Sequence, residues 1–418
     1  MTCASLAFSG CASSRMSDHE SDNLFREGRY EEAAERLKKG MEENDGPEGK
    51  DGLLYLLDIG LSLHAAGKYA ESNKYFLEAD KMAEIKDYTS LAAESAGLLT
   101  SDNVKQYKGE DFENTLINVY LAMNYAALGA REDALVEARR VNRKLNLMKT
   151  EGKRNYKQNA FARYLSAVLY ESEKDWNNAL LDYKFTADLA PGMPGIGVDQ
   201  WRMAYALRMT DRLRELEKKY RITHEEKAEA RSLVNGNGAG RPGEIVVIYE
   251  NGISPRKLPN PSWNSIPQFY PRNNPVVRGR AMVEGMKKGL DVQETETFIL
   301  HDVQATAIQN LEEKWGGILA KKVAGIVAKE VAGAAVASAT KNEGIGQIVK
   351  LALYLSDQAD LRSWNLLPRD LQVARFVVKP GNYQVKLEPI GMGALPEKVV
   401  AVAPGQKVFV NFRFMPVQ

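Results

Sequence analysis

Cysteine and histidine are scarce in this chain of 418 residues. The 2 cysteines, Cys3 and Cys11, both precede residue 12, so the body of the protein can form neither a disulfide bond nor a thiolate metal site. Four scattered histidines are too few for a His-rich metal cluster. We therefore expect no metal and no cofactor.

Long apolar runs and strongly basic blocks are missing as well. No run of about 18 uninterrupted apolar residues occurs, so a conventional transmembrane helix is not expected. The net charge of +1 is the sum of an acidic first part and a basic second part of the chain. Residues 1–240 carry 34 Lys and Arg against 39 Asp and Glu, whereas residues 241–418 carry 22 Lys and Arg against 16 Asp and Glu. Basic residues are not interleaved with aromatic ones, so we do not expect nucleic acid as a partner.

The segment from Leu6 to Ser14 resembles a bacterial lipobox. Small residues precede Cys11, as the signal peptidase cleft requires, and the thiol of Cys11 would carry the diacylglycerol. Phe8 replaces the usual aliphatic residue, and no basic residue precedes the apolar run, so this interpretation needs a basic region upstream. Ala12, rather than Asp, follows the cysteine, and by resemblance to Gram-negative lipoproteins this favours the outer membrane. We predict a lipoprotein signal and flexible tether over residues 1–19; the alternative is an accidental cysteine in a disordered leader.

Residues 20–234 are predicted to form successive helical hairpins. Small residues recur where two helices would cross, and glycines recur where the first helix of a pair would end. The repeated positions are Leu24, Gly28, Tyr30, Ala33 and Leu37; Gly60, Leu63, Gly67, Tyr69, Ser72, Phe76 and Ala79; Ala122, Tyr125, Gly129, Ala134 and Ala138; and Ala167, Tyr170, Trp176, Ala179, Tyr183 and Pro191.

This pattern resembles the tetratricopeptide repeat, a two-helix unit that stacks into a solenoid. Equivalent positions lie 39, 62 and 45 residues apart, so extra structure is expected around residues 84–112. Residues 198–234 would form a closing hairpin. The first helices of successive repeats would line a concave groove, and we predict that Asn118, Asn124 and Arg163 are exposed there and bind an envelope protein. The alternative is that they are ordinary solvated helix positions.

The second half is predicted to be mixed. A Gly- and Asn-rich linker covers residues 235–243. Residues 244–370 are predicted to form a mixed α/β domain, with strands at 244–249 and 297–300 and a helix at 303–340. Alternating strands at 371–418 would pack on this domain as a β-sandwich. These last strands resemble transthyretin-like or PEGA modules. The predicted fold class is therefore α+β multidomain, with an N-terminal α-helical solenoid.

The proline-rich segment 255–275 is predicted to be a long loop, and basic residues surround it: Arg256, Lys257, Arg272, Arg278 and Arg280. Residues 256–280 are either a surface loop with solvated charges or a contact surface for anionic lipid or glycan. The Gly- and Ala-rich stretch 316–339 suits close helix packing, on a sheet or on another copy of the chain. Its charged residues argue against a membrane span.

Asp360, Arg362 and Trp364 form the most distinctive string. An Asp–Arg pair beside a tryptophan could belong to a catalytic pocket, and a cleft joining it to His301 would support that alternative. No activated nucleophile or metal-ligand cluster accompanies the pair, so we predict a structural latch.

Together, the lipobox, the repeats, Tyr249–Gly252, the Asp360–Trp364 string and Pro380-Gly381 resemble a family of bacterial tetratricopeptide-repeat lipoproteins. The resemblance implies a scaffold in the cell envelope and no catalytic residues. Two other functions stay open: an activator of peptidoglycan synthesis, and an enzyme acting on envelope glycans.

Overall fold

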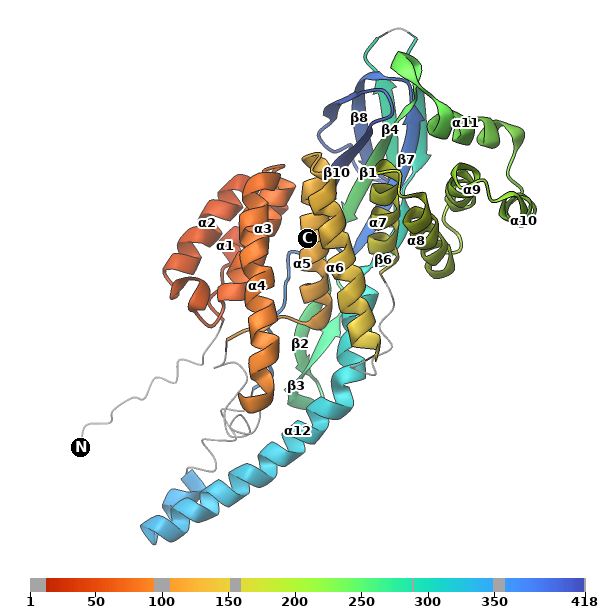
Figure 1. The fold of residues 1–418 in the computed structure, drawn as a ribbon. Helices are drawn as coiled ribbons and strands as arrows, with labels where there is room; N and C mark the ends of the chain where they lie inside the picture. The colour runs from red at the N-terminus through yellow and green to blue at the C-terminus, as the bar shows by residue number, and fades with distance from the viewer. Residues whose placement is uncertain (1–12, 94–105, 151–158, 288, 349–357, 417–418) are drawn as a thin grey trace.

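The computed structural model describes residues 13–93, 106–150, 159–287, 289–348 and 358–416. Its first half is helical and its second half contains the strands (Figure 1). The helices of the first half are α1 His19–Arg26, α2 Tyr30–Glu42, α3 Gly52–Ala65, α4 Tyr69–Ala93, α5 Asp111–Ala127, α6 Arg131–Thr150, α7 Ala160–Ser172, α8 Trp176–Leu189, α9 Ile196–Ala206, α10 Thr210–Tyr220 and α11 His224–Asn235.

Helices α1 to α8 pair as successive hairpins, and each hairpin stacks on the next, as the repeat pattern predicts. The predicted turn glycines Gly28, Gly67 and Gly129 each have a φ of +77°, which L residues rarely adopt. Close helix crossing also needs a small residue at Gly60, where a Cβ atom would approach the ring of Phe76 to 2.8 Å. The hairpin array therefore follows directly from local sequence.

The described residues of the second half form two four-stranded sheets, one hairpin and one long helix. Its elements are β1 Gly243–Asn251, β2 Arg256–Asn260, β3 Trp263–Tyr270, β4 Gly279–Gly285, β5 Val292–Glu296, β6 Phe298–Asp302, α12 Val303–Thr340, β7 Asp370–Val378, β8 Gly381–Pro389, β9 Lys398–Val402 and β10 Lys407–Phe414. The first sheet has the order β10-β1-β7-β6, with β1 parallel to β10, and the second has the order β5-β4-β8-β9.

These sheets correct the predicted division at residue 370. Strand β1 lies between β7 and β10, and β4 pairs with β8, so both sheets combine strands from the two predicted segments. Residues 371–418 therefore do not form a sandwich of their own, because their strands need partners from residues 243–296. The predicted loop 255–275 is also wrong in part, since it contains the β2–β3 hairpin.

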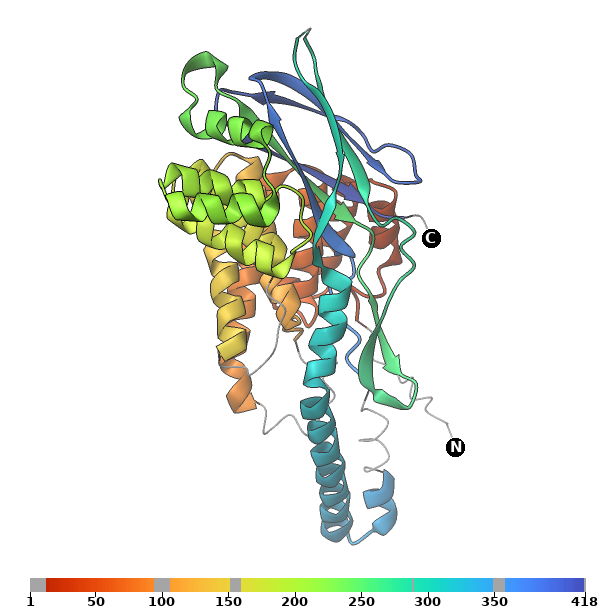
Figure 2. The same cartoon turned by 90° about the vertical axis from the view of Figure 1, so that its right-hand side faces the viewer.

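Strand β1 is apolar without alternation because both of its faces are covered. Ile245, Val247 and Tyr249 enter the core between the two sheets, whereas Val246 and Ile248 join the core of the helical array. The molecule thus has three layers: helices, the first sheet and the second sheet (Figures 1 and 2).

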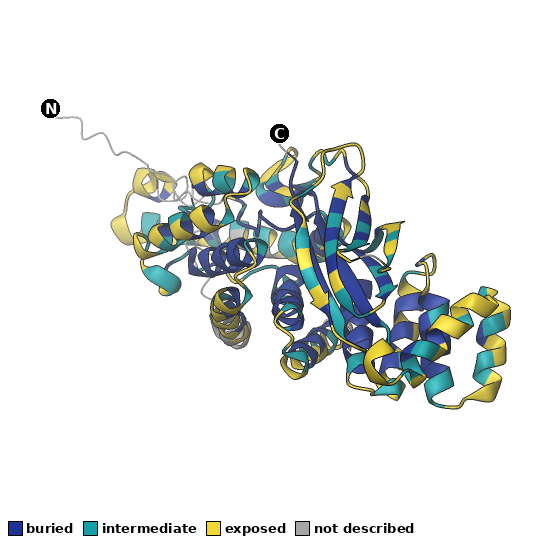
Figure 3. Ribbon diagram, turned by 90° about the horizontal axis from the view of Figure 1, so that it is seen from above, coloured by how far each residue is buried: buried dark blue, intermediate teal, exposed yellow. Residues whose placement is uncertain are grey.

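The inner helices α3, α5 and α7 contact this first sheet and are buried along nearly their whole length (Figure 3). They are the first helices of their hairpins. The concave side of the array is therefore filled by the sheet of the same chain.

Helix α12 leaves the body as a long arm (Figure 2). Ala307 and Leu311 near its start are buried, whereas Val323, Val327 and Val331 further out are 49%, 59% and 63% exposed. By length and composition alone α12 could cross a membrane, and only 12% of its most apolar stretch is buried in the described structure. The predicted packing of residues 316–339 on a sheet is not found in the described part of the chain.

Residues 343–348 form a short helical segment that returns along this arm (Figure 2). A Cβ atom on Gly346 would come within 2.6 Å of Ala337, so the small-residue packing expected of this stretch occurs between α12 and its own return segment.

Candidate binding groove

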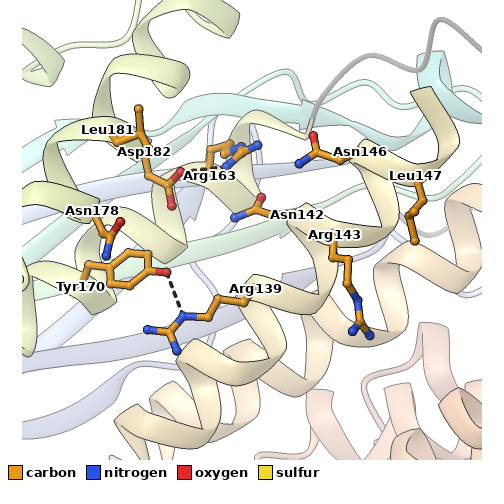
Figure 4. A pocket seen from close by; sticks show the side chains of 10 residues that line it. All are labelled: Arg139, Asn142, Arg143, Asn146, Leu147, Arg163, Tyr170, Asn178, Leu181 and Asp182. Atoms are coloured by element: carbon orange, nitrogen blue, oxygen red, sulfur yellow. Dashed lines mark hydrogen bonds and ion pairs between the residues drawn. The ribbon is translucent and has the colours of Figure 1, made fainter. Parts of the chain in front are cut away.

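A concave groove of about 390 Å³ lies among α6, α7 and α8, and we call it the α6–α8 groove (Figure 4). It is lined by Arg139, Asn142, Arg143, Asn146, Leu147, Arg163, Tyr170, Asn178, Leu181 and Asp182. The four polar residues from α6 are spaced by 3, 4 and 7 positions from the first, so one face of this helix supplies them all.

Two arginines, Arg139 and Arg143, lie on one wall of the groove, and contacts hold the first of them in place. The Nε atom of Arg139 donates to the hydroxyl of Tyr170 over 2.8 Å, and its guanidinium lies 5.1 Å from that ring (Figure 4). Arg143 is exposed and has no ion-pair partner among the described residues. A planar guanidinium whose orientation is fixed in this way binds carboxylates well.

The opposite wall is a buried ion pair with apolar neighbours. Nη1 of Arg163 donates to Asp182 over 2.9 Å, and Ser166 donates to the same carboxylate over 2.7 Å. Burial raises the pKa of Asp182 above its usual value, against the influence of these donors. Leu181 and Phe185 remain 48% and 39% exposed. The groove therefore offers cationic and amide donors beside apolar surface.

The exposure predicted for the three groove residues is wrong. Asn118 and Asn124 are completely buried and Arg163 is 8% exposed. Asn118 donates to Glu137 over 2.8 Å, and Asn124 donates to Ser72 over 2.9 Å. The physical reason is packing between neighbouring helices: the partner of Asn118 lies on α6, that of Asn124 on α4 and that of Arg163 on α8. Only Arg163 lines a groove, and its charge is already paired.

Asn124 belongs to a first buried polar junction between the helices and the sheet, the Glu250 junction of His64, Tyr120, Asn124 and Glu250. Nε2 of His64 lies 2.9 Å from the carboxylate of Glu250, and the hydroxyl of Tyr120 donates to the same carboxylate over 2.9 Å. Burial opposes ionisation of Glu250, yet His64 and Tyr120 keep its pKa below the usual value. The amide oxygen of Asn124 faces Nδ1 of His64, and the amide nitrogen donates to Asn73 over 2.8 Å.

The Glu171 junction is a second, larger cluster in which acidic and basic residues alternate. Glu171 on α7 accepts from Arg202 over 2.6 Å and from Arg375 over 2.9 Å. Burial opposes ionisation of Glu171, but these cations and Lys407 hold its pKa well below the usual value. The remaining members are Asp199 and Glu244.

The Glu110 junction ties α5 to β2 and α12. The carboxylate of Glu110 accepts from Lys257 over 2.6 Å and from Lys314 over 3.2 Å. Burial opposes ionisation here too, and the two lysines nevertheless hold the pKa of Glu110 far below its usual value. Lys257, which was predicted to lie in a basic surface loop, is 5% exposed.

Asp360, Arg362 and Trp364 lie between the array and the sheet. Nη2 of Arg362 contacts Asp360 at 2.8 Å, and its Nη1 donates to the carbonyl of Lys50 over 3.1 Å. Trp364 is 1% exposed, and its backbone N–H donates to Glu113 over 2.8 Å. This arrangement is that of a bridge between distant segments; the latch role of the three residues stays a prediction.

His301 does not join this group in a catalytic constellation. It lies on β6, and burial in apolar surroundings lowers its pKa to about 4. Arg362 instead lines a pocket of about 710 Å³ with N-terminal residues such as Ser13 and Met16. Among the described residues, no group of three His, Cys, Asp or Glu is placed to hold a metal ion.

The predicted lipidation site Cys11 lies outside the described residues, but the segment after it does not. The hydroxyl of Ser13 donates to Asp51 over 2.8 Å, and Nε of Arg15 donates to Asp58 over 2.6 Å. Arg15 is 2% exposed. The flexible tether predicted up to residue 19 is therefore wrong from residue 13 onward, because this segment is bonded to α3.

Comparison with known proteins adds little to this geometry. No protein-family profile and no curated protein matches the chain. Among solved structures, the MamA RS-1 ArsTM double mutant aligns at 14% identity and a TM-score of 0.32, covering 50% of this chain and 96% of its own. BtubC (BKLC) from P. vanneervenii aligns at 14% identity and a TM-score of 0.32, covering 52% and 79%.

A tetratricopeptide repeat protein from Parabacteroides merdae aligns at 13% identity and a TM-score of 0.25, covering 53% of this chain and 85% of its own. Scores this low carry no argument about function. The helical-hairpin architecture is established by the elements themselves.

The α6–α8 groove was missed by sequence reasoning, although a signal for it exists. Arg139, Asn142, Arg143 and Asn146 follow one helical face, yet the prediction considered only the first helices of the hairpins. The covering of those helices by the sheet depends on contacts between residues more than 100 positions apart, which local patterns do not reveal.

Proposed function

We propose that the protein is a non-catalytic scaffold of the bacterial cell envelope, anchored in the outer membrane by a lipid on Cys11, which binds an envelope protein through the α6–α8 groove. The observation that carries the proposal is the groove itself. It combines fixed donors with exposed apolar side chains on a helical array whose concave side is covered by the sheet of the same chain. Its lining residues suit recognition more than chemistry, since they include no paired nucleophile and base.

The charge of the groove suggests the chemistry of the partner. Arg139 and Arg143 are cations, whereas the acidic Asp182 is already neutralised by Arg163. An acidic segment with a few apolar side chains would complement this surface, because carboxylates would meet the guanidinium groups and apolar residues would meet Leu181.

Site-specific photocrosslinking in cells tests the groove. A photoreactive residue replaces Leu181 in the groove or Leu77, which is 41% exposed on α4, as a control position. We expect a discrete protein adduct from position 181 and not from position 77. The Arg139→Gln/Arg143→Gln variant should lose this adduct.

The matched control removes the same charge elsewhere. Arg212→Gln/Arg214→Gln lies on α10, outside the groove, and should keep the adduct. Equal loss in both double variants, or the same adduct from position 77, would show that the groove is not the binding site.

The anchor is tested separately by metabolic labelling with an alkyne fatty acid. The wild-type chain should be labelled and the Cys11→Ser variant should not. Equal labelling of the two, or labelling of neither, would refute the anchor and leave the groove proposal standing.

A further inference from the structure

Three arginines from distant segments converge in a second pocket, of about 420 Å³. Arg26 comes from α1, Arg256 from β2 and Arg272 from the segment after β3. We call this site the arginine pocket. Arg256 and Arg272 belong to the basic region predicted from sequence, whereas the third member was not predicted.

Within the part of the chain that the structure describes, these arginines lack a matching set of acidic partners. Asp22 is the acidic residue that lines the arginine pocket, and Arg15 already contacts it at 2.7 Å. The Nε atoms of Arg26 and Arg272 are buried and have no hydrogen-bond partner among the described residues. Buried donors without acceptors are costly, so the pocket is built for an anion that would supply them.

The electrostatics of Arg272 agree with this geometry. Burial, followed by repulsion from Arg26 and Arg256, lowers the pKa of Arg272 to about 10. Its hydrogen bond to the amide oxygen of Asn365 is long, at 3.4 Å.

The other basic residues of the predicted loop are neutralised. Lys257 is paired with Glu110 at 2.6 Å, Arg278 with Glu296 at 3.2 Å and Arg280 with Glu388 at 3.9 Å. Basic residues close in sequence are thus separated by structure into compensated pairs and one uncompensated pocket.

The position of the arginine pocket indicates where an anion would come from. Met16 and His19, which directly follow the docked Ser13–Arg15 segment, line it. The neighbouring pocket of about 710 Å³ shares these two residues and Arg256, and it adds the apolar side chains of Pro259 and Leu361. An arginine site therefore continues into a partly apolar site at the place where the N-terminal segment enters the body.

We propose that the arginine pocket binds the phosphate group of an anionic lipid headgroup, with the neighbouring pocket accommodating the glycerol region. Guanidinium groups match phosphate oxygens geometrically, and the positive charge of three of them attracts the negative charge of a phosphodiester in a partly buried site. The choice of a lipid over a free phosphate rests on the membrane anchoring in the proposed function.

Vesicle co-sedimentation tests this with the full chain carrying Cys11→Ser, so that no acyl chain contributes. The vesicles contain phosphatidylcholine alone or phosphatidylcholine with phosphatidylglycerol. We expect binding to the second kind only, and a loss of at least about fivefold in the Arg26→Gln/Arg272→Gln variant, equivalent to about 1 kcal/mol. Arg256→Gln, at an exposed position, should weaken binding without any effect on folding.

The control variant Arg278→Gln/Arg280→Gln removes the same formal charge from compensated pairs and should bind as the parent does. Thermal melting identifies any variant that does not fold, and Arg256→Gln then carries the test. Equal weakening in the control would show a general charge effect and overturn the pocket.

Two further results would also overturn the proposal. One is no binding of the parent chain to the phosphatidylglycerol vesicles. The other is stabilisation by inorganic phosphate that depends on Arg26 and Arg272 without vesicle binding, which would indicate a free phosphate ligand. Fatty-acid labelling and crosslinking from position 181 do not depend on these arginines, so failure here is distinguishable from failure of the proposed function.

Discussion

At the scale of single residues, Trp364 illustrates how one side chain joins the two halves of the chain. Its ring lies 5.8 Å from that of Phe76 on α4 and 5.6 Å from that of Tyr120 on α5. We expect Trp364→Ala to lower the free energy of unfolding by about 3–5 kcal/mol, because a large buried aromatic leaves a cavity that cannot collapse. Chemical denaturation measures this.

The control for this prediction is Trp263→Ala on β3. Trp263 is 37% exposed, so its truncation should change the free energy of unfolding by less than about 1 kcal/mol. If Trp364→Ala were as stable as wild type yet lost partner or vesicle binding, the latch role would be wrong and the residue would belong to a binding site.

The ion pairs of Glu110 should make the free energy of unfolding depend on pH. Its lowered folded-state pKa means that its ion pairs contribute fully above the unfolded-state pKa of 4.5 and are lost as the pH falls further. Glu110→Gln should lower the free energy of unfolding at pH 7 by about 3–5 kcal/mol, because Lys257 stays buried without its partner. The difference from wild type should narrow progressively below pH 4.

Denaturation series at pH 3.5, 5 and 7 check this, with Glu284→Gln as the control. Glu284 pairs with Lys386 at 3.0 Å in an exposed position, so its loss should cost about 0–1 kcal/mol at every pH. A difference for Glu110→Gln that is constant across the series would contradict the assigned ion pairs.

At the scale of elements, α12 has two parts with opposite roles. Leu311 near its start is 3% exposed and contributes to the main core, whereas Val327 on the arm is 59% exposed. We expect Leu311→Ala to lower the free energy of unfolding by about 2–5 kcal/mol and Val327→Ala to change it by less than about 0.5 kcal/mol. Comparable effects of the two substitutions would mean that the arm packs on the body in solution.

Elements with strong local signals could be predicted from the sequence. The hairpins of the array, strand β1 and the bounds of α12 follow from periodicity, turn glycines and a continuous apolar run. Strands β4 and β5 were missed, since β5 lies at a sheet edge with a mostly exposed sequence and so lacks alternation. The β2–β3 hairpin was missed because its prolines argued for a loop.

The candidate site was harder to predict, because it depends on which faces are covered. Nothing local to Asn118 or Asn124 distinguishes a groove residue from one that is buried against a neighbouring helix. Likewise Arg26 and Arg272 are separated by more than 240 positions, and only the docking of α1 beside the β2–β3 region brings them together.

At the scale of the whole molecule, the two halves are joined by three buried polar junctions, at Glu110, Glu171 and Glu250. Charges that are buried and paired across a boundary are strongly destabilising when one side is removed. The helical array and the sheets should therefore unfold together, with coincident transitions in far-ultraviolet circular dichroism and tryptophan fluorescence.

The same reasoning predicts that residues 13–234 do not fold alone. Without the sheet, the apolar faces of α3, α5 and α7 would be exposed and Glu171 would lose partners from β7 and β10. We expect this fragment to bind a hydrophobic dye and to melt without a cooperative transition. A sharp melting transition in the isolated fragment would show that the array is an independent domain.

The docked start of the described chain has a consequence for geometry on a membrane. Only Ala12 separates Cys11 from the bonded Ser13, so an acyl chain on Cys11 would be joined to the body by a linker of roughly 7 Å. So short a link would remove most of the freedom of the body to rotate or to extend into the periplasm, and would hold one side of the molecule against the headgroups. The arginine pocket beside this segment would then meet lipid at an effective concentration in the millimolar range or above, so that even a weak intrinsic affinity would keep it occupied.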